Sequence, residues 1–138
     1  MKLIDANIII YAVGRSHPYK EPCERLFGQI RQGITGYTID AELIQEVLYV
    51  YSYRGDRRQA FAMVDELFVI FPDPLAIRRE ELTVARRLME AHPALVPRDA
   101  IHAAVVIIQG LEGIVTTARA FRQVSGLVAY DPMELVSG

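Results

Sequence analysis

The 138-residue sequence has a single cysteine, Cys23, and no long hydrophobic run. One cysteine excludes an internal disulfide and every metal site built from several thiolates, so we expect a buried, inert thiol. The apolar runs at residues 8–13 and 103–108 are far shorter than the roughly 18 residues that a membrane-spanning helix needs. Asp5 interrupts any signal-peptide core, so the cytoplasm is the expected location.

The chain also has no excess of positive charge, because its formal net charge is -2 at pH 7. Proteins that coat nucleic acid without sequence preference usually carry a basic stripe, so any contact with nucleic acid is expected to be local. Lys2 and Lys20 are the only lysines among fifteen basic residues, which leaves thirteen arginines. Guanidinium groups suit bidentate phosphate contacts, so the composition permits a phosphate ligand at a defined site.

Three glycine-containing signatures are missing: G-x-G-x-x-G, G-x-x-x-x-G-K-[ST] and G-x-S-x-G. Their absence removes support for dinucleotide binding, P-loop chemistry and a serine hydrolase. The sequence is 51% hydrophobic and 23% charged, without a repeat of fixed period. Such a composition at this length predicts one globular domain over residues 1–138.

Short strand-like segments alternate with longer helical segments, which predicts an α/β fold with three layers, α/β/α, around a central twisted parallel sheet of four to five strands. The expected strands are residues 2–4, 34–38, 68–71, 113–116 and 127–130. The expected helices are residues 19–31, a helix capped by Asp40 that continues to 53, and residues 57–67, 75–91 and 97–109. Residues 8–13 either extend the first strand or begin a helix, and periodicity does not decide.

Acidic and polar residues follow several of these strands or lie in the first turns of the next helices. In open α/β sheets, ligands collect beyond the carboxyl ends of the strands, so these positions are the candidates for chemistry. They are Asp5 with Asn7, the turns from Asp40 to Glu46, Asp99, and Thr116 with Thr117.

Three carboxylates stand out among these candidates. Asp5 could simply cap the following helix, and Asp99 could complement the positive end of its own helix. Glu46 has apolar neighbours on both sides and needs a partner, whereas Glu42, one turn earlier, is the rival. If Asp5, Glu46 and Asp99 approach within about 5 Å, each pair repels by roughly 3 kcal/mol at an effective dielectric near 20.

A divalent cation would reverse this repulsion. Ligands that are all oxygen select magnesium or manganese over zinc, and such a metal suits phosphodiester hydrolysis. His102 is three residues after Asp99 and shares its helix face, but we expect a histidine at the core edge with one hydrogen bond. His17 and His92 lie beside prolines and are expected on the surface.

Four motifs in this order resemble the PIN-domain ribonucleases, especially the VapC-type toxins of toxin–antitoxin pairs. The resemblance covers nearly the whole chain. The motifs are Ile4-Asp5-Ala6-Asn7 with the apolar run after it, Asp40-Ala41-Glu42-Leu43-Ile44-Gln45-Glu46, Pro97-Arg98-Asp99-Ala100-Ile101-His102, and Ile114-Val115-Thr116-Thr117 followed by Phe121.

This resemblance implies a PIN-like fold, a magnesium or manganese site, an RNA substrate, a cognate antitoxin protein and a homodimer. It assigns catalytic and metal-binding roles to Asp5, Glu46 and Asp99, with support from Asn7 and Thr116. Arginines near this rim are the expected phosphate contacts; they are Arg98, Arg119 and Arg122.

The fourth acidic position of the family is not acidic here. Family members usually place aspartate after the threonines and again two residues later, and this sequence has Ala118 and Ala120. The leading hypothesis is therefore a metal-dependent endoribonuclease with three carboxylates, and the alternative is a PIN-fold binding module that has lost its activity. A phosphoacceptor receiver domain is disfavoured, because it needs paired acids after the first strand and a late lysine.

Overall fold

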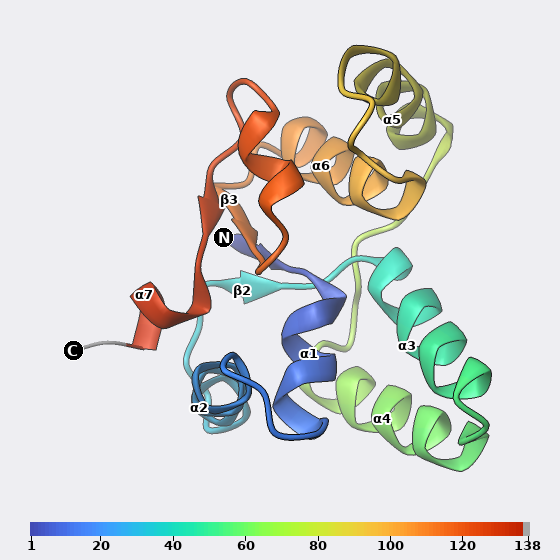
Figure 1. The fold of residues 1–138 in the computed structure, drawn as a ribbon. Coiled ribbons are helices and arrows are strands. Elements are labelled where there is room, and N and C mark those ends of the chain that lie inside the picture. The colour runs from blue at the N-terminus through green and yellow to red at the C-terminus, as the bar shows by residue number, and fades with distance from the viewer. Residues whose placement is uncertain (137–138) are drawn as a thin grey trace.

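A computed structural model describes residues 1–136 and contains one sheet of four parallel strands in the order β2-β1-β3-β4 (Figure 1). The strands are β1 (Lys2–Ile4), β2 (Tyr37–Thr38), β3 (Gly113–Val115) and β4 (Ala129–Tyr130). In the register, Leu3 lies opposite Thr38 on one side and Ile114 on the other. Four of the five expected strands are therefore present, each as long as predicted or shorter.

Helices occupy most of the remaining chain. They are α1 (Ala6–Val13), α2 (Lys20–Arg31), α3 (Ala41–Tyr53), α4 (Arg57–Ile70), α5 (Arg79–Ala91), α6 (Pro97–Gln109), the 3-10 helix η1 (Arg119–Gln123) and α7 (Pro132–Val136). Asp40 and Asp56 cap α3 and α4 through side-chain oxygens that accept hydrogen bonds from backbone amides. The expected cap at Asp40 and the helix boundaries at 31, 53, 91, 97 and 109 are confirmed.

The sheet separates two hydrophobic cores, because alternate residues of a strand point to opposite faces. Ile4 and Val115 pack with α1, α2, α3 and α4, whereas Leu3 and Ile114 pack with α5, α6 and Phe121. Figure 1 shows α5 and α6 on one side of the sheet and α1 and α2 on the other. The predicted three-layer α/β/α architecture is confirmed.

Residues 68–71, expected as a strand, form the last turn of α4 and the residue after it. Phe68 and Val69 are exposed, so this apolar run does not lie in the interior. Extending an existing helix by one turn is easier than starting a strand that has no neighbour. Pro72 then disfavours helical backbone at Phe71, where α4 ends.

The helix expected over residues 75–91 begins only at Arg79. Leu75 is extended and forms a parallel bridge with Asp40, in which its amide donates to the carbonyl of Ile39 at 2.9 Å. The backbone amide of Arg78 donates to the Glu81 side chain at 3.1 Å, which sets the start of the helix.

Residues 8–13, for which the sequence left strand and helix open, belong to helix α1. Within residues 1–136, no helix has the length and apolar character needed to cross a bilayer.

Candidate metal centre at the carboxyl edge of the sheet

Asp5 follows β1 and Thr116 follows the neighbouring strand β3, so the parallel register places them side by side. The hydroxyl of Thr116 donates to Oδ2 of Asp5 at 2.7 Å and accepts a hydrogen bond from the Ala118 amide at 3.0 Å. Asp5 precedes α1, but its side chain makes no capping hydrogen bond. Its carboxylate is therefore held by the Thr116 hydroxyl at the edge of the sheet and does not cap α1.

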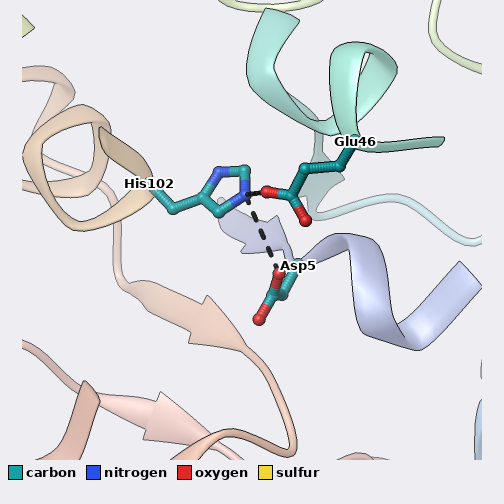
Figure 2. A group of neighbouring side chains, drawn as sticks. All are labelled: Asp5, Glu46 and His102. Atoms are coloured by element: carbon teal, nitrogen blue, oxygen red, sulfur yellow. Dashed lines mark hydrogen bonds and ion pairs between the residues drawn. The ribbon is translucent and has the colours of Figure 1, made fainter. Parts of the chain in front are cut away.

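Helices α3 and α6 bring two more functional side chains to this edge. Nε2 of His102, on α6, lies 2.7 Å from Oε1 of Glu46, on α3, and 3.7 Å from Oδ1 of Asp5. Figure 2 shows the Nε2 edge of the imidazole facing both carboxylates, which come from different elements of the fold. The other ring nitrogen, Nδ1, lies 2.7 Å from Oδ2 of Asp40.

His102 is fully buried and faces carboxylates through both ring nitrogens. Burial alone would lower the pKa of His102, but the charge and hydrogen bond of Asp40 and the hydrogen bond of Glu46 raise it well above its usual value. An imidazole donates through both nitrogens only when it is protonated. His102 is therefore an imidazolium whose positive charge offsets part of the negative charge at this edge.

Asp99, the third predicted carboxylate, lines the same pocket as Asp5 and Glu46. The pocket has a volume of about 470 Å³. Burial, and then the charge of Asp5, raise the pKa of Asp99 to about 6. Burial also raises the pKa of Asp5, against the opposing effects of His102 and Thr116. Burial is the largest cause of both shifts, and neighbouring carboxylates add to it, because Asp5 raises the pKa of Asp99 and Glu46 raises that of Asp5.

The donor set fits a divalent cation that prefers oxygen. One oxygen each of Asp5 and Glu46 and one nitrogen of His102 lie within 4.8 Å of one another. Asn7 also lines the pocket, and its buried Oδ1 accepts no hydrogen bond, although its Nδ2 donates to Thr116 at 3.5 Å. An unused carbonyl oxygen beside crowded carboxylates is the arrangement that a hard cation or its bound water would satisfy.

His102 is less suited to bind such a cation directly. Both ring nitrogens are already engaged by Asp40 and Glu46, so ligation through Nε2 would require loss of its proton and of the contact with Glu46. The positively charged ring instead holds the Glu46 carboxylate in place. Sequence reasoning missed this arrangement, because it treated His102 as a residue with one hydrogen bond and Asp40 only as a helix cap.

The predicted arginines differ in position. Arg98 lines the pocket, and its Nε lies 3.8 Å from Oε2 of Glu46. Arg119 and Arg122 are exposed on η1 and do not line the pocket, so their phosphate contacts stay predictions.

Glu42, the rival of Glu46, lines the pocket without joining the hydrogen-bond network. Burial, and then the charge of Glu46, raise the pKa of Glu42.

The position expected to carry a fourth acid lies in the pocket. Ala118 is one of its lining residues, whereas Ala120 is not and packs against the core that contains Phe121. The structure thus brings Asp5, Glu46, Asp99, Asn7 and Arg98 to one cavity, with Thr116 behind them. Their functional roles remain predictions.

Comparison with known proteins identifies related sequences and folds. The family model described as PIN domain matches residues 2–127. Ribonuclease VapC13 of Mycobacterium tuberculosis is 30% identical over 127 residues, which cover 92% of this chain and 97% of that protein. Ribonuclease VapC7 of the same organism is 31% identical over 137 residues, covering 96% and 92%.

Two solved structures share the fold. FitAcB from Neisseria gonorrhoeae has a TM-score of 0.72 at 14% identity and covers 96% of this chain and 98% of its own. VapBC2 from Rickettsia felis, bound to a DNA fragment from its promoter, has a TM-score of 0.69 at 15% identity, covering 93% and 96%. At these identities the likeness concerns the fold alone.

Proposed function

The chain belongs to the PIN domain family, and from that premise we propose that the protein is a metal-dependent endoribonuclease, the toxin of a type II toxin–antitoxin pair. The observation that carries the proposal is the convergence of Asp5, Glu46 and Asp99 on one pocket from three distant segments of the chain. Relatives that align over nearly the whole chain are named ribonucleases, which supports RNA as the substrate.

Asp5 and Asp99 would hold Mg²⁺ or Mn²⁺, and Glu46 would bind it through water or orient the attacking water. The bound cation would acidify a water molecule and stabilise negative charge on a phosphate oxygen. The unused Oδ1 of Asn7 supports this assignment, because it offers one more oxygen to the ion or its water shell.

Residues around the carboxylates would keep them in position. Thr116 holds one oxygen of Asp5 and leaves the other directed toward His102, 3.7 Å away. His102 holds Oε1 of Glu46 and leaves Oε2 toward Arg98. An RNA phosphate entering the pocket would compete with Glu46 for Arg98, whose side chain is more than half exposed.

The proposal includes a protein partner. The chain also shares its fold with a toxin–antitoxin complex from Klebsiella pneumoniae, at a TM-score of 0.65 and 18% identity. We propose by analogy that this protein binds a cognate antitoxin and forms a homodimer. Copurification with the product of an adjacent reading frame, followed by light scattering, tests both points.

The central test is RNA cleavage with Mn²⁺ by the wild type and by the Asp5→Asn and Asp99→Asn variants. Both variants should lose nearly all cleavage, because each loses a metal-binding charge. Asp65→Asn is the matched control, since Asp65 is exposed on α4 and lies away from the pocket. Equal cleavage by all four proteins would refute the assignment.

Ala118 favours a second candidate, a PIN-fold binding module without catalytic activity. This alanine lies at the pocket wall where the family usually provides an acid. Calorimetry separates the two functions: Mn²⁺ binding without RNA cleavage supports the binding module, whereas Mn²⁺ binding with cleavage supports the nuclease.

A further inference from the structure

A second pocket adjoins the candidate metal centre at the far end of α1. It has a volume of about 550 Å³ and is lined by the last turn of α1, the loop that follows, and Arg54 at the end of α3. Ile10 lines both this pocket and the metal-centre pocket, so the two are neighbours. The eight residues of α1 extend about 12 Å along its axis, which a short run of single-stranded nucleotides can follow.

The charge of this second pocket is opposite to that of the metal centre. Arg15 and Arg54 both line it, and none of its lining residues is acidic. Both arginines are exposed, and neither forms an ion pair within residues 1–136, in contrast to Arg31, which pairs with Glu66. Lys20 donates to the carbonyl of Ala12 at 3.1 Å and so offsets the negative end of α1. The Arg54 guanidinium also lies over the Tyr51 ring, 5.8 Å from its centroid. In a chain of net charge -2, two guanidinium groups without an ion pair in one concave site attract an anion.

The pocket also presents a flat aromatic surface. The ring of His17 stacks on that of Tyr11 with centroids 4.5 Å apart and an interplanar angle of 21°. The Tyr19 amide donates to Nδ1 of His17 at 3.2 Å, which fixes the orientation of the ring. His17 is exposed, and the Tyr19 ring also lies beside it with centroids 5.9 Å apart, so a planar ligand would contact the part of the imidazole that the two tyrosines leave open. Aromatic planes beside a basic groove are the features that hold single-stranded nucleic acid without sequence preference.

We propose that this second pocket binds one nucleotide of single-stranded RNA that flanks the cleavage position. Arg15 and Arg54 hold its phosphate, and the stacked rings of Tyr11 and His17 receive its base. This inference rests on the proposed ribonuclease function and locates part of the substrate path. The pocket adjoins the candidate metal centre, where RNA would be cut. The stacked rings favour a nucleotide over an acidic peptide as its ligand.

The test measures binding of a fluorescein-labelled 12-nucleotide single-stranded RNA by anisotropy in EDTA, at several NaCl concentrations. Losing one phosphate contact should reduce the slope of log K against log salt by about 0.7. The double variant Arg15→Ala/Arg54→Ala should show this smaller slope and bind about tenfold more weakly. His17→Ala should weaken binding while leaving the slope unchanged, because it removes stacking and keeps both guanidinium groups.

The control is Arg25→Ala/Arg87→Ala, which removes the same charge from exposed arginines that line neither pocket. It should retain the wild-type slope and affinity. The four arginines that these double variants replace are all exposed, and thermal melting checks that each variant is folded.

Cleavage with Mn²⁺ separates failure of this inference from failure of the proposed function. If the Arg15→Ala/Arg54→Ala variant binds and cuts RNA like the wild type, the second pocket is not an RNA subsite, although the nuclease remains. If the wild type neither binds nor cuts RNA, the proposed function fails and the inference with it. If the double variant keeps RNA binding but loses binding to a poly-glutamate peptide, the pocket is an acidic-peptide site and our proposal is wrong.

Discussion

Nδ1 of His102 lies 2.7 Å from Oδ2 of Asp40, and both side chains are fully excluded from solvent. The other oxygen of Asp40 accepts the Leu43 amide at 3.0 Å and so caps α3. One carboxylate therefore begins the helix that carries Glu46 and also anchors the imidazolium that contacts Glu46. Removing Asp40 would leave a buried positive charge with one partner fewer, which is costly.

We predict that Asp40→Ala lowers the free energy of unfolding by about 3 kcal/mol or more, since it breaks a buried ion pair and removes a helix cap. Asp56→Ala is the matched control, because Asp56 also caps a helix but is exposed. It should cost about 1 kcal/mol. Urea denaturation of both variants measures the difference, and equal losses would contradict a structural role for the contact between Asp40 and His102.

Most of the fold could be predicted from local patterns. Asp40 and Pro97 mark helix starts by mechanisms that act within one turn, and both boundaries are found where expected. The strand expected at residues 68–71 is wrong, because four apolar residues fit a buried strand or a helix end equally well. Only the absence of a neighbouring strand decides between them, and that depends on the tertiary structure.

The candidate site was predictable as a set of acids but not as a network. Asp5 could be selected because it follows a strand, Glu46 because it lies among apolar residues, and Asp99 because it lies in the first turn of a helix. The bond between His102 and Asp40 joins residues 62 positions apart, and a helix cap with a second buried partner looks in sequence like an ordinary cap. The unpaired Oδ1 of Asn7 likewise has no sequence signal.

Protonation of Asp99 should affect the stability of the metal-free protein. Its pKa is raised from 3.8 to about 6, so the native state binds its proton more tightly than the unfolded chain. The free energy of unfolding therefore falls as pH rises from about 4 to about 6. In EDTA at about pH 7, Asp99→Asn should be more stable than the wild type by about 1 kcal/mol, a value reduced for the partial exposure of Asp99.

This gain should shrink to nearly nothing at about pH 4, where Asp99 is protonated in the native wild type. Urea denaturation across this pH range gives the comparison. Adding Mn²⁺ should reverse the order at neutral pH, because the wild type binds the ion more tightly. A gain that is the same at both pH values would show that Asp99 does not carry the raised pKa.

Gly113 in β3 is expected to tolerate no side chain. A Cβ there would overlap the carbonyl oxygen of Val128 and lie 2.8 Å from the Tyr130 ring. Gly113→Ala should therefore destabilise the protein by about 2 kcal/mol or more. Gly28→Ala is the control, because a Cβ at this helical position meets nothing within 4 Å and should stabilise by up to about 1 kcal/mol. Loss of stability in both variants would contradict the close packing of β3 on β4.

A carboxylate introduced at position 118 should raise the affinity of the candidate metal centre for a divalent cation. Ala118 lines the pocket of Asp5 and Asp99, and its amide is fixed by the hydroxyl of Thr116 at 3.0 Å. Ala118→Asp adds one more carboxylate beside Asp5, Glu46 and Asp99, which raises repulsion in the metal-free protein and increases the attraction for a divalent cation. We expect Mn²⁺ to bind about tenfold more tightly, which corresponds to about 1.4 kcal/mol, and RNA cleavage to increase.

Ala120→Asp is the control for charge alone, because Ala120 lies two residues away and does not line the pocket. Calorimetry gives the Mn²⁺ affinity of each protein, and the Mn²⁺-induced rise in melting temperature gives an independent readout. The rise should be larger for Ala118→Asp than for the wild type, while Ala120→Asp should show no greater rise. If the two variants respond to Mn²⁺ equally, position 118 does not face the ion, and the prediction is wrong.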